Sequence, residues 1–307
     1  MPWPHFRNSE SCRSGDWLTA NTRKRKRSCV AGFATTGESA AKSGAMRDTK
    51  MIAIDLKGKS ILMTGALGAI AEHIVRKLEG AGATLALTDI QPEQTAQRTL
   101  DGWKIPRASY SYFAADITDA GAVEGVVAQA FERWPTLGTV LGHAGGCGLH
   151  PFATTSAEEY ARIFCFNYFA QTYLARAVLE QWTKRGIAGH LIFTSSYVAR
   201  MPHTKIPAYA SAKAALENFA RCVALEYAGT GIRVNVVSPG NVAAGSSLKV
   251  FEEDAAYREF VLRVSLGQRN SPESIADAFV FLCSPLAREI NGQVLSADYG
   301  GGIGNRL

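Results

Sequence analysis

Between residues 57 and 297 the chain alternates short apolar runs with longer segments whose apolar residues recur every three to four positions. The short runs predict buried strands, and the longer segments predict amphipathic helices. The predicted strands cover residues 60–63, 84–87, 110–114, 139–141, 190–194, 233–237 and 293–297. The predicted helices cover residues 71–78, 122–134, 157–184, 210–227 and 272–283.

This order of elements is typical of βαβ units, which build a parallel sheet. The strand runs are mostly apolar and do not alternate with polar residues as a half-exposed strand would, as expected when helices cover both faces of the sheet. No linker or second alternating block interrupts the pattern. The sequence therefore predicts an α/β fold, a Rossmann-like doubly wound parallel sheet flanked by helices, in a single domain over residues 51–307.

Residues 1–50 follow no such pattern and carry the net charge. They contain ten Lys/Arg and four Asp/Glu residues, including the basic run 23–27, whereas the rest of the chain has 23 of each. This composition predicts a disordered basic extension. A secretory signal, a transit peptide and a nucleic-acid address all fit it poorly, and Met46 and Met51 offer later start sites. The neutral remainder argues against nucleic acid as a partner.

Two further absences narrow the class of protein. No apolar run approaches the 18 residues of a membrane span, so we expect no membrane association. The six cysteines show neither C-x-x-C nor zinc-ligand spacing. This cysteine pattern favours reduced thiols, a cytoplasmic location and no bound metal.

A nucleotide-binding turn is predicted after the first strand. Residues 64–71 read Thr-Gly-Ala-Leu-Gly-Ala-Ile-Ala, and small side chains there allow a pyrophosphate to approach the backbone N–H groups of the helix start. Asp89 ends the second strand, where a carboxylate accepts hydrogen bonds from ribose hydroxyls and repels a 2′-phosphate. The pair predicts NAD as the cofactor, in preference to NADP.

Tyr209 and Lys213 stand one helical turn apart, so that the ammonium can lower the phenol pKa from about 10. Such a phenol exchanges a proton with an alcohol or carbonyl. The spacing alone also fits an ordinary surface pair. Ser196, at the carboxyl end of a predicted parallel strand, strengthens the catalytic interpretation because ligands of open α/β sheets bind there.

Together with Phe166-Asn167-Tyr168 and the run 233–240, these motifs resemble the short-chain dehydrogenase/reductase superfamily, compact single-domain type, over residues 56–302. The resemblance implies hydride transfer between a nicotinamide and a secondary alcohol or ketone. It implies the catalytic set Ser196, Tyr209, Lys213 and Asn167, with Asn167 supporting a water relay. It also implies homodimers or homotetramers. The cofactor contacts expected are Gly65, Gly68, Ala69, Ile70, Asp89, Asp116, Ile117, His143, Ala144, Gly145, Tyr209, Lys213, Pro239, Gly240 and Val242.

The chain departs from the family pattern mainly at the cofactor positions. Alanines replace turn glycines at Ala69 and Ala71, and the Asn-Asn-Ala-Gly motif reads Gly142-His143-Ala144-Gly145. Ala244 replaces a threonine, and the late Asp-Gly-Gly reads Asp-Tyr-Gly at 298–300. Asp116 has an alternative interpretation as part of a helix cap, shared with Asp119.

Substrate choice is expected to lie in the amphipathic segment 243–268, with Tyr197, His203 and residues 146–152. These residues favour a small sugar or polyol substrate. A 3-oxoacyl thioester reductase-like enzyme is the alternative within the class. A nicotinamide-binding sensor without turnover is the alternative outside it.

Overall fold

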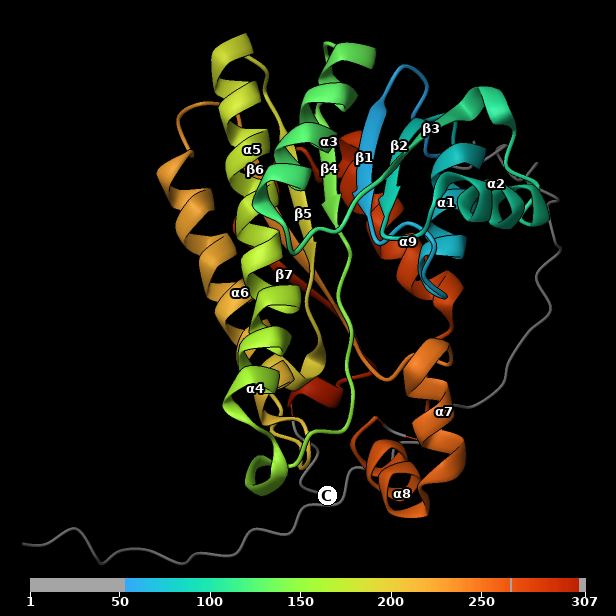
Figure 1. Ribbon diagram of the computed structural model, residues 1–307, viewed down its shortest axis with the longest axis vertical. Helices are drawn as coiled ribbons and strands as arrows, with labels where there is room; N and C mark the ends of the chain where they lie inside the picture. Colours follow the sequence, from blue (N-terminus) through green and yellow to red (C-terminus); the bar gives the residue numbers. More distant parts are fainter. Residues whose placement is uncertain (1–52, 266, 304–307) are drawn as a thin grey trace, which may run out of the picture. The chain divides into compact units, whose positions relative to one another are not determined.

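The computed structural model describes residues 53–265 and 267–303. The predicted basic extension lies outside them. Seven parallel strands form one sheet in the order β3-β2-β1-β4-β5-β6-β7 (Figure 1). The strands are β1 (Ser60–Thr64), β2 (Thr84–Asp89), β3 (Tyr110–Ala114), β4 (Thr139–Gly142), β5 (His190–Thr194), β6 (Arg233–Pro239) and β7 (Val294–Ala297). The chain winds outward in both directions from β1 and β4, as a doubly wound sheet does.

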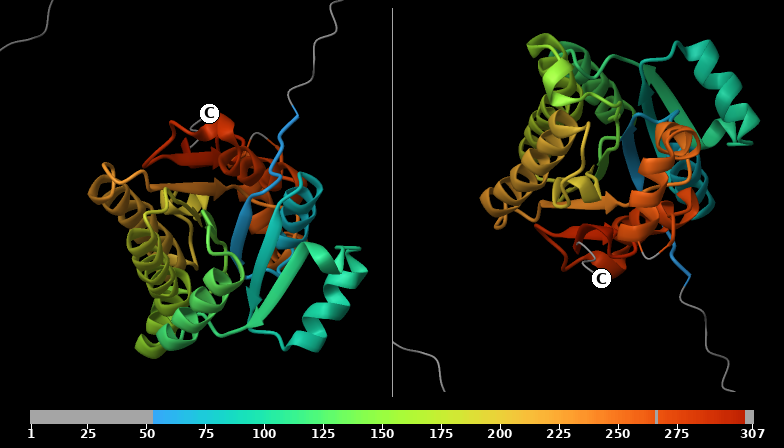
Figure 2. Two further views of the ribbon diagram at one scale, coloured as in Figure 1. Left: turned by 90° about the horizontal axis from the view of Figure 1, so that it is seen from above. Right: turned by 90° about the horizontal axis from the view of Figure 1, so that it is seen from below.

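Helices cover both faces of the sheet (Figure 2). One face of the sheet forms a hydrophobic core with helices α1 (Ala71–Gly80), α2 (Glu93–Gly102) and α9 (Pro272–Cys283). The other face does so with helices α3 (Ala120–Arg133), α5 (Ala170–Arg185) and α6 (Pro207–Glu226). Strand β5 is buried along its whole length because both layers cover it, which is why its centre, residues 191–193, is apolar at every position.

Each predicted strand is present, with ends within two residues of those expected. Helix α2 was missed because it buries only Ala96 and Leu100 and so shows a weak apolar pattern. The long helix expected over 157–184 consists of α4 (Ala157–Phe164), a π-helical turn (Cys165–Phe169) and α5.

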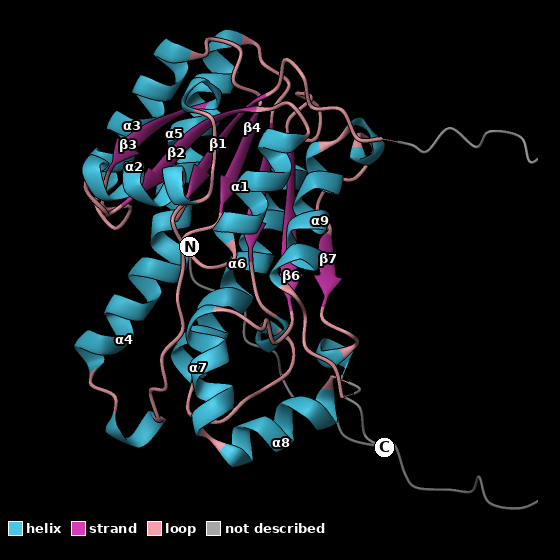
Figure 3. Cartoon of the chain, turned by 90° about the vertical axis from the view of Figure 1, so that its right-hand side faces the viewer, coloured by secondary structure: helices cyan, strands magenta, loops and turns pink. Residues whose placement is uncertain are grey.

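The amphipathic segment 243–268 forms two helices, where the pattern suggested one. They are α7 (Gly245–Glu253) and α8 (Ala255–Val264), separated at Asp254. The Asp254 carboxylate accepts a hydrogen bond from the Tyr257 backbone N–H at 2.9 Å and so starts a new helix. Both helices lie beyond the carboxyl ends of the strands (Figure 3). None of the helices described here has the length and apolarity that a membrane span requires.

Candidate active site

A cavity of about 740 Å³ opens at the carboxyl end of the sheet and extends between Asp89 and the helices α7 and α8. It lies where the strand order reverses between β1 and β4, the position at which open α/β sheets bind ligands. The structure brings all the expected cofactor contacts to its wall, together with Ser196, Tyr209 and Lys213. Asn167 is the one predicted site residue that does not line it.

The turn between β1 and α1 forms the nucleotide end of the cavity. Gly65 has a φ of +64°, and a Cβ atom there would lie 2.6 Å from the Cα of Ala144, so only glycine fits. The alanines at Ala69 and Ala71 have negative φ values, which any residue adopts. Their departure from the family pattern therefore leaves the backbone of the turn unstrained.

Asp89 lies beside this turn at the end of β2. Its Oδ2 accepts a hydrogen bond from the backbone N–H of Leu67 at 3.1 Å. The Tyr112 hydroxyl donates to the Asp89 carbonyl at 3.1 Å and holds the strand end in place. The carboxylate is thereby fixed at the wall of the cavity.

Asp116 and Asp119 have separate roles. Asp116 accepts hydrogen bonds from the Thr118 backbone N–H at 2.9 Å and hydroxyl at 2.7 Å, which shapes the loop after β3. Asp119 caps α3 by accepting from the Ala122 N–H at 2.9 Å. The two residues therefore do not share the cap, and Asp116 lines the cavity.

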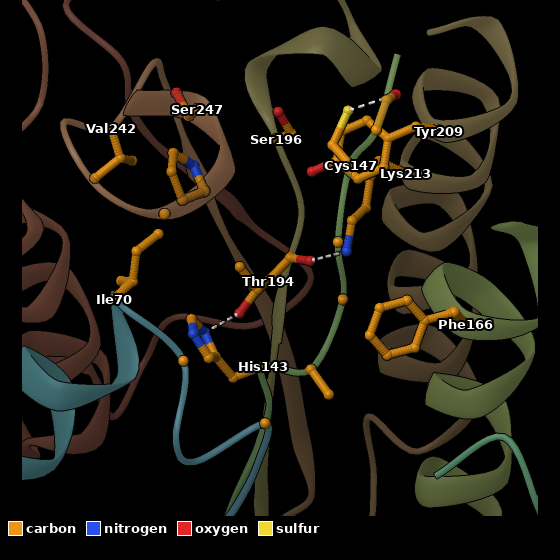
Figure 4. Close-up of a pocket in the computed structure, with 18 of the residues that line it drawn as sticks. Ile70, His143, Cys147, Phe166, Thr194, Ser196, Tyr209, Lys213, Val242 and Ser247 are labelled. Carbon is orange, nitrogen blue, oxygen red and sulfur yellow. Dashed lines mark hydrogen bonds between the residues drawn. The ribbon is translucent and has the colours of Figure 1, made fainter. Parts of the chain in front are cut away.

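His143 takes the place of an asparagine at the end of β4. Its backbone N–H donates to the Thr64 hydroxyl at 3.2 Å, and its ring Nδ1 lies 3.0 Å from the Thr194 hydroxyl (Figure 4). Burial, assisted by the charge of Lys213, lowers the pKa of His143 to about 4. The ring is therefore neutral near pH 7, with one nitrogen that donates and one that accepts.

Tyr209 and Lys213 project from α6, which begins with Pro207 at its first position. The Lys213 ammonium donates to the Thr194 carbonyl at 2.9 Å and lies 5.7 Å from the centre of the Tyr209 ring (Figure 4). Burial lowers the pKa of Lys213 to about 8.

The protonation of Tyr209 differs from the sequence-based expectation. Burial raises the pKa of its phenol, and the neighbouring Ser196 hydroxyl opposes this only in part. Lys213 was expected to lower that pKa, but removal of the phenol from water is the dominant influence, and it raises the pKa. Tyr209 consequently holds its proton near neutral pH.

Asn167 lies within the π-helical turn and is 1% exposed. Its side chain accepts a hydrogen bond from the Gly146 N–H at 3.1 Å and donates to the Gly146 and Ile163 carbonyls at 3.0 and 3.1 Å. These bonds satisfy the whole amide locally. Asn167 thus holds the loop after β4 against the site from behind.

The substrate end contains the expected Cys147, Tyr197 and His203. Burial raises the pKa of the Cys147 thiol to about 12, so the thiol is protonated. Sequence reasoning did not single out Asn241, Ser247 or Tyr257, which also line this end. No local motif marks them, because they meet only when α7 and α8 fold over the sheet.

A family model described as "Enoyl-(Acyl carrier protein) reductase" matches residues 65–301. A 2,3-dihydro-2,3-dihydroxybenzoate dehydrogenase of Bacillus subtilis is 28% identical over 262 residues, which are 83% of this chain and 100% of the relative. A galactitol 2-dehydrogenase (L-tagatose-forming) of Cereibacter sphaeroides is 28% identical over 247 residues, covering 80% and 95% of the two chains.

Among solved structures, the fold is similar to that of a 3-ketoacyl-(acyl-carrier-protein) reductase from Brucella melitensis complexed with NADH. The TM-score is 0.72 at 24% identity, and the match covers 81% of this chain and 100% of the other. At this level of identity, the likeness concerns the fold alone.

Proposed function

This chain belongs to the short-chain dehydrogenase/reductase superfamily of oxidoreductases that act on CH–OH groups with a nicotinamide cofactor, and from that premise we propose that it is an NAD-dependent dehydrogenase of a sugar or polyol. One observation carries the proposal. Ser196, Tyr209 and Lys213 converge on the same cavity whose other end holds Asp89 and the Gly65 turn. Proton-transfer groups and a nucleotide cradle thus share one space.

The residues present fit a nicotinamide dinucleotide. A Cβ at Gly65 would meet Ala144, and one at Gly145 would lie 2.9 Å from the Lys213 Nζ, so the cradle is open only because both are glycines. The Gly65 turn and the start of α1 would hold the pyrophosphate. The neutral His143 would hydrogen-bond a ribose. When bound, the cofactor supplies the hydride acceptor or donor.

The preference for NAD rests on Asp89. Its carboxylate is held toward the cavity by the Leu67 N–H and retains lone pairs for two ribose hydroxyls. A 2′-phosphate at this position would meet a like charge.

The chain's own contribution is proton transfer and orientation. Ser196 would hydrogen-bond the substrate oxygen, and Tyr209 would pass a proton to it or take one from it. Because burial raises the pKa of Tyr209, the phenol is protonated at neutral pH and is ready to act as the acid in ketone reduction. Lys213 would hold the nicotinamide ribose, and its charge favours the phenolate that alcohol oxidation requires.

The sugar or polyol preference is supported by the hydroxyls and amide at the substrate end and by the two relatives, whose names denote a dihydroxy acid derivative and a hexitol. The intact Ser196, Tyr209 and Lys213 set favours turnover over the sensor hypothesis. The family membership also supports a cytoplasmic homodimer or homotetramer that acts on a small molecule.

The test is nicotinamide reduction by the full chain, with NAD and NADP, against polyols, sugars, steroids, simple secondary alcohols and 3-hydroxyacyl thioesters. We expect turnover with NAD and a polyol or sugar. Tyr209→Phe should lower kcat by about 1,000-fold, because it removes the proton-transfer group and little else. NADH affinity, measured by fluorescence titration, should change by less than about 2-fold.

Tyr173→Phe, on the outer helix α5 and away from the cavity, is the matched control and should retain full turnover. Retained activity in Tyr209→Phe would refute the assignment. Binding of NADH without turnover of any substrate by the unmodified chain would favour the sensor.

A further inference from the structure

A chain of hydrogen bonds runs from Arg269 through Asn241 to Tyr257 at the substrate end of the cavity. The Arg269 Nε donates to the Asn241 Oδ1 at 2.7 Å, and the Asn241 Nδ2 donates to the Tyr257 hydroxyl oxygen at 2.7 Å. Arg269 is held in turn by the Val242 carbonyl at 3.0 Å and by stacking 4.0 Å from the centre of the Phe251 ring.

The direction of these hydrogen bonds follows from the chemistry of the Arg269 guanidinium. A guanidinium can only donate, so the amide oxygen of Asn241 must face Arg269 and the amide nitrogen must face Tyr257. The phenol oxygen therefore accepts a hydrogen bond. Its own O–H group is left to donate elsewhere, and the polarisation by Arg269 and Asn241 makes it a better donor.

Within residues 53–265 and 267–303 the structure shows no hydrogen bond that the Tyr257 hydroxyl donates. Burial raises the pKa of Tyr257, and the neighbouring Ser247 hydroxyl opposes this in part; Ser247 itself makes no well-formed hydrogen bond among the same residues, so both hydroxyls can bind a ligand. Both side chains belong to the wall of the cavity. Tyr209 lines the same cavity, so the two phenols face one space.

The position of Tyr257 is fixed from several sides. Its backbone N–H donates to Asp254, and the Asp254 carboxylate pairs with Lys205 at 3.5 Å, which ties α8 to the loop before α6. The His203 ring packs edge-on against the Tyr257 ring, with centroids 5.2 Å apart. A donor held in this way is preorganised for a ligand, because little rotational freedom remains to be lost on binding.

We propose that Tyr257 donates a hydrogen bond to a second oxygen of the substrate, and that Asn241 and Arg269 orient it, so that the enzyme selects alcohols with a further hydroxyl or carbonyl oxygen beside the reacting carbon. This inference rests on the proposed function. It narrows the substrate class to polyoxygenated alcohols, and it makes Tyr257 a specificity-determining residue.

The test compares cyclohexane-1,2-diol with cyclohexanol, two rings that differ by the second oxygen. The unmodified full chain should have a kcat/KM for the diol about 10- to 100-fold above that for cyclohexanol, because a buried donor is left unpaired with the simple alcohol. Tyr257→Phe should remove most of this ratio. Tyr173→Phe should leave it unchanged.

Asn241→Leu and Arg269→Met test the orienting role, because both variants keep Tyr257. Each should raise KM for the diol and so lower the diol-to-cyclohexanol ratio of kcat/KM several-fold. A loss of kcat for both rings alike would indicate only a structural role and would contradict the proposal. So would a diol preference that survives in Tyr257→Phe.

Binding separates this inference from the proposed function. Tyr209→Phe, with NADH, is titrated with each ring compound by ligand-observed NMR, alone and combined with Tyr257→Phe. Tighter binding of the diol that depends on Tyr257 supports the inference even if the unmodified chain turns over neither ring. Equal binding of diol and cyclohexanol overturns it, whatever the dehydrogenase assay shows.

Discussion

At the scale of single residues, burial decides which protons the site carries. It lowers the pKa values of His143 and Lys213, to about 4 and about 8, and raises that of Tyr209. In each case the neutral form is favoured, because a charge loses its hydration in the wall of the cavity. At the Tyr209 end of the cavity, the titratable groups are therefore neutral or easily neutralised.

His143→Asn should make the protein less sensitive to acid. The pKa of His143 is about 4 in the folded chain and about 6.5 in the unfolded chain, so the unfolded chain takes up this proton first as pH falls. The free energy of unfolding of the unmodified protein therefore falls as the pH is lowered from 6.5 to about 4. Asparagine does not titrate, so the variant should lose about 2 kcal/mol less free energy of unfolding between pH 7 and pH 4.5.

Urea denaturation at the two pH values measures this difference. His190, whose pKa burial lowers to about 3, remains in both proteins, so the variant keeps part of the acid sensitivity. Identical pH dependence in the variant and the unmodified protein would show that His143 is not held neutral.

At the scale of elements, the π-helical turn Cys165–Phe169 matters most for the site. Its wider hydrogen-bonding ring interrupts the regular helix between α4 and α5, and it carries Asn167. The Asn167 side chain reaches the Gly146 backbone from both sides, as donor and as acceptor. A helix irregularity thus supports the loop after β4, which lies against Lys213.

Asn167→Ala should reduce both stability and turnover. It leaves the Gly146 N–H without its partner, which costs about 1–3 kcal/mol in the free energy of unfolding. The loosened loop should lower kcat by about 10-fold or more, because Gly145 lies against Lys213. Urea denaturation and steady-state kinetics measure the two effects.

Cys165→Ala, in the same π-helical turn, is the control, because the Cys165 thiol has only a long contact of 4.0 Å with the Thr118 carbonyl. It should change stability by less than about 1 kcal/mol and leave kcat unaltered. An Asn167→Ala protein with full kcat would show that the loop needs no support from this turn.

At the scale of the whole molecule, a polar cluster joins helix α6 to the last strand. The Ser195 hydroxyl donates to the Glu217 carboxylate of α6 at 2.9 Å, and the Arg200 Nε lies 3.9 Å from the same carboxylate. Arg200 also donates to the Ser296 hydroxyl in β7 at 2.7 Å and lies 4.0 Å from the Asp298 carboxylate. These contacts connect the end of β5 with α6 and β7, which are distant in the sequence, next to Ser196.

Glu217→Ala should lower the free energy of unfolding by about 1–3 kcal/mol, because it leaves the buried Ser195 hydroxyl without its acceptor and removes one of the two carboxylates near Arg200. Glu217→Gln should cost less, since its amide oxygen still accepts from Ser195. Glu226→Ala, exposed at the end of the same helix, is the control and should cost less than about 0.5 kcal/mol. Thermal and urea unfolding provide the comparison. A Glu217→Ala protein as stable as the Glu226→Ala protein would show that the cluster contributes nothing.

The sequence by itself determined the sheet, most of the helices and the two ends of the site. Short, mostly apolar runs predict the seven strands because helices on both faces of the sheet favour apolar side chains on both sides of a strand. The turn at Gly65 and the pair Tyr209 and Lys213 were predictable because each depends on spacing within one element. The predicted residues reach one cavity because the carboxyl ends of parallel strands meet at the same edge.

Only the tertiary structure decided the features that depend on contacts between distant segments. The separation of α7 from α8 at Asp254, and the path from Arg269 through Asn241 to Tyr257, join residues with no local signal. The raised pKa of Tyr209 depends on how much of the fold surrounds it, and no local spacing reports that. Periodicity reports which side chains are buried, but burial and hydrogen bonding across the fold set their chemistry.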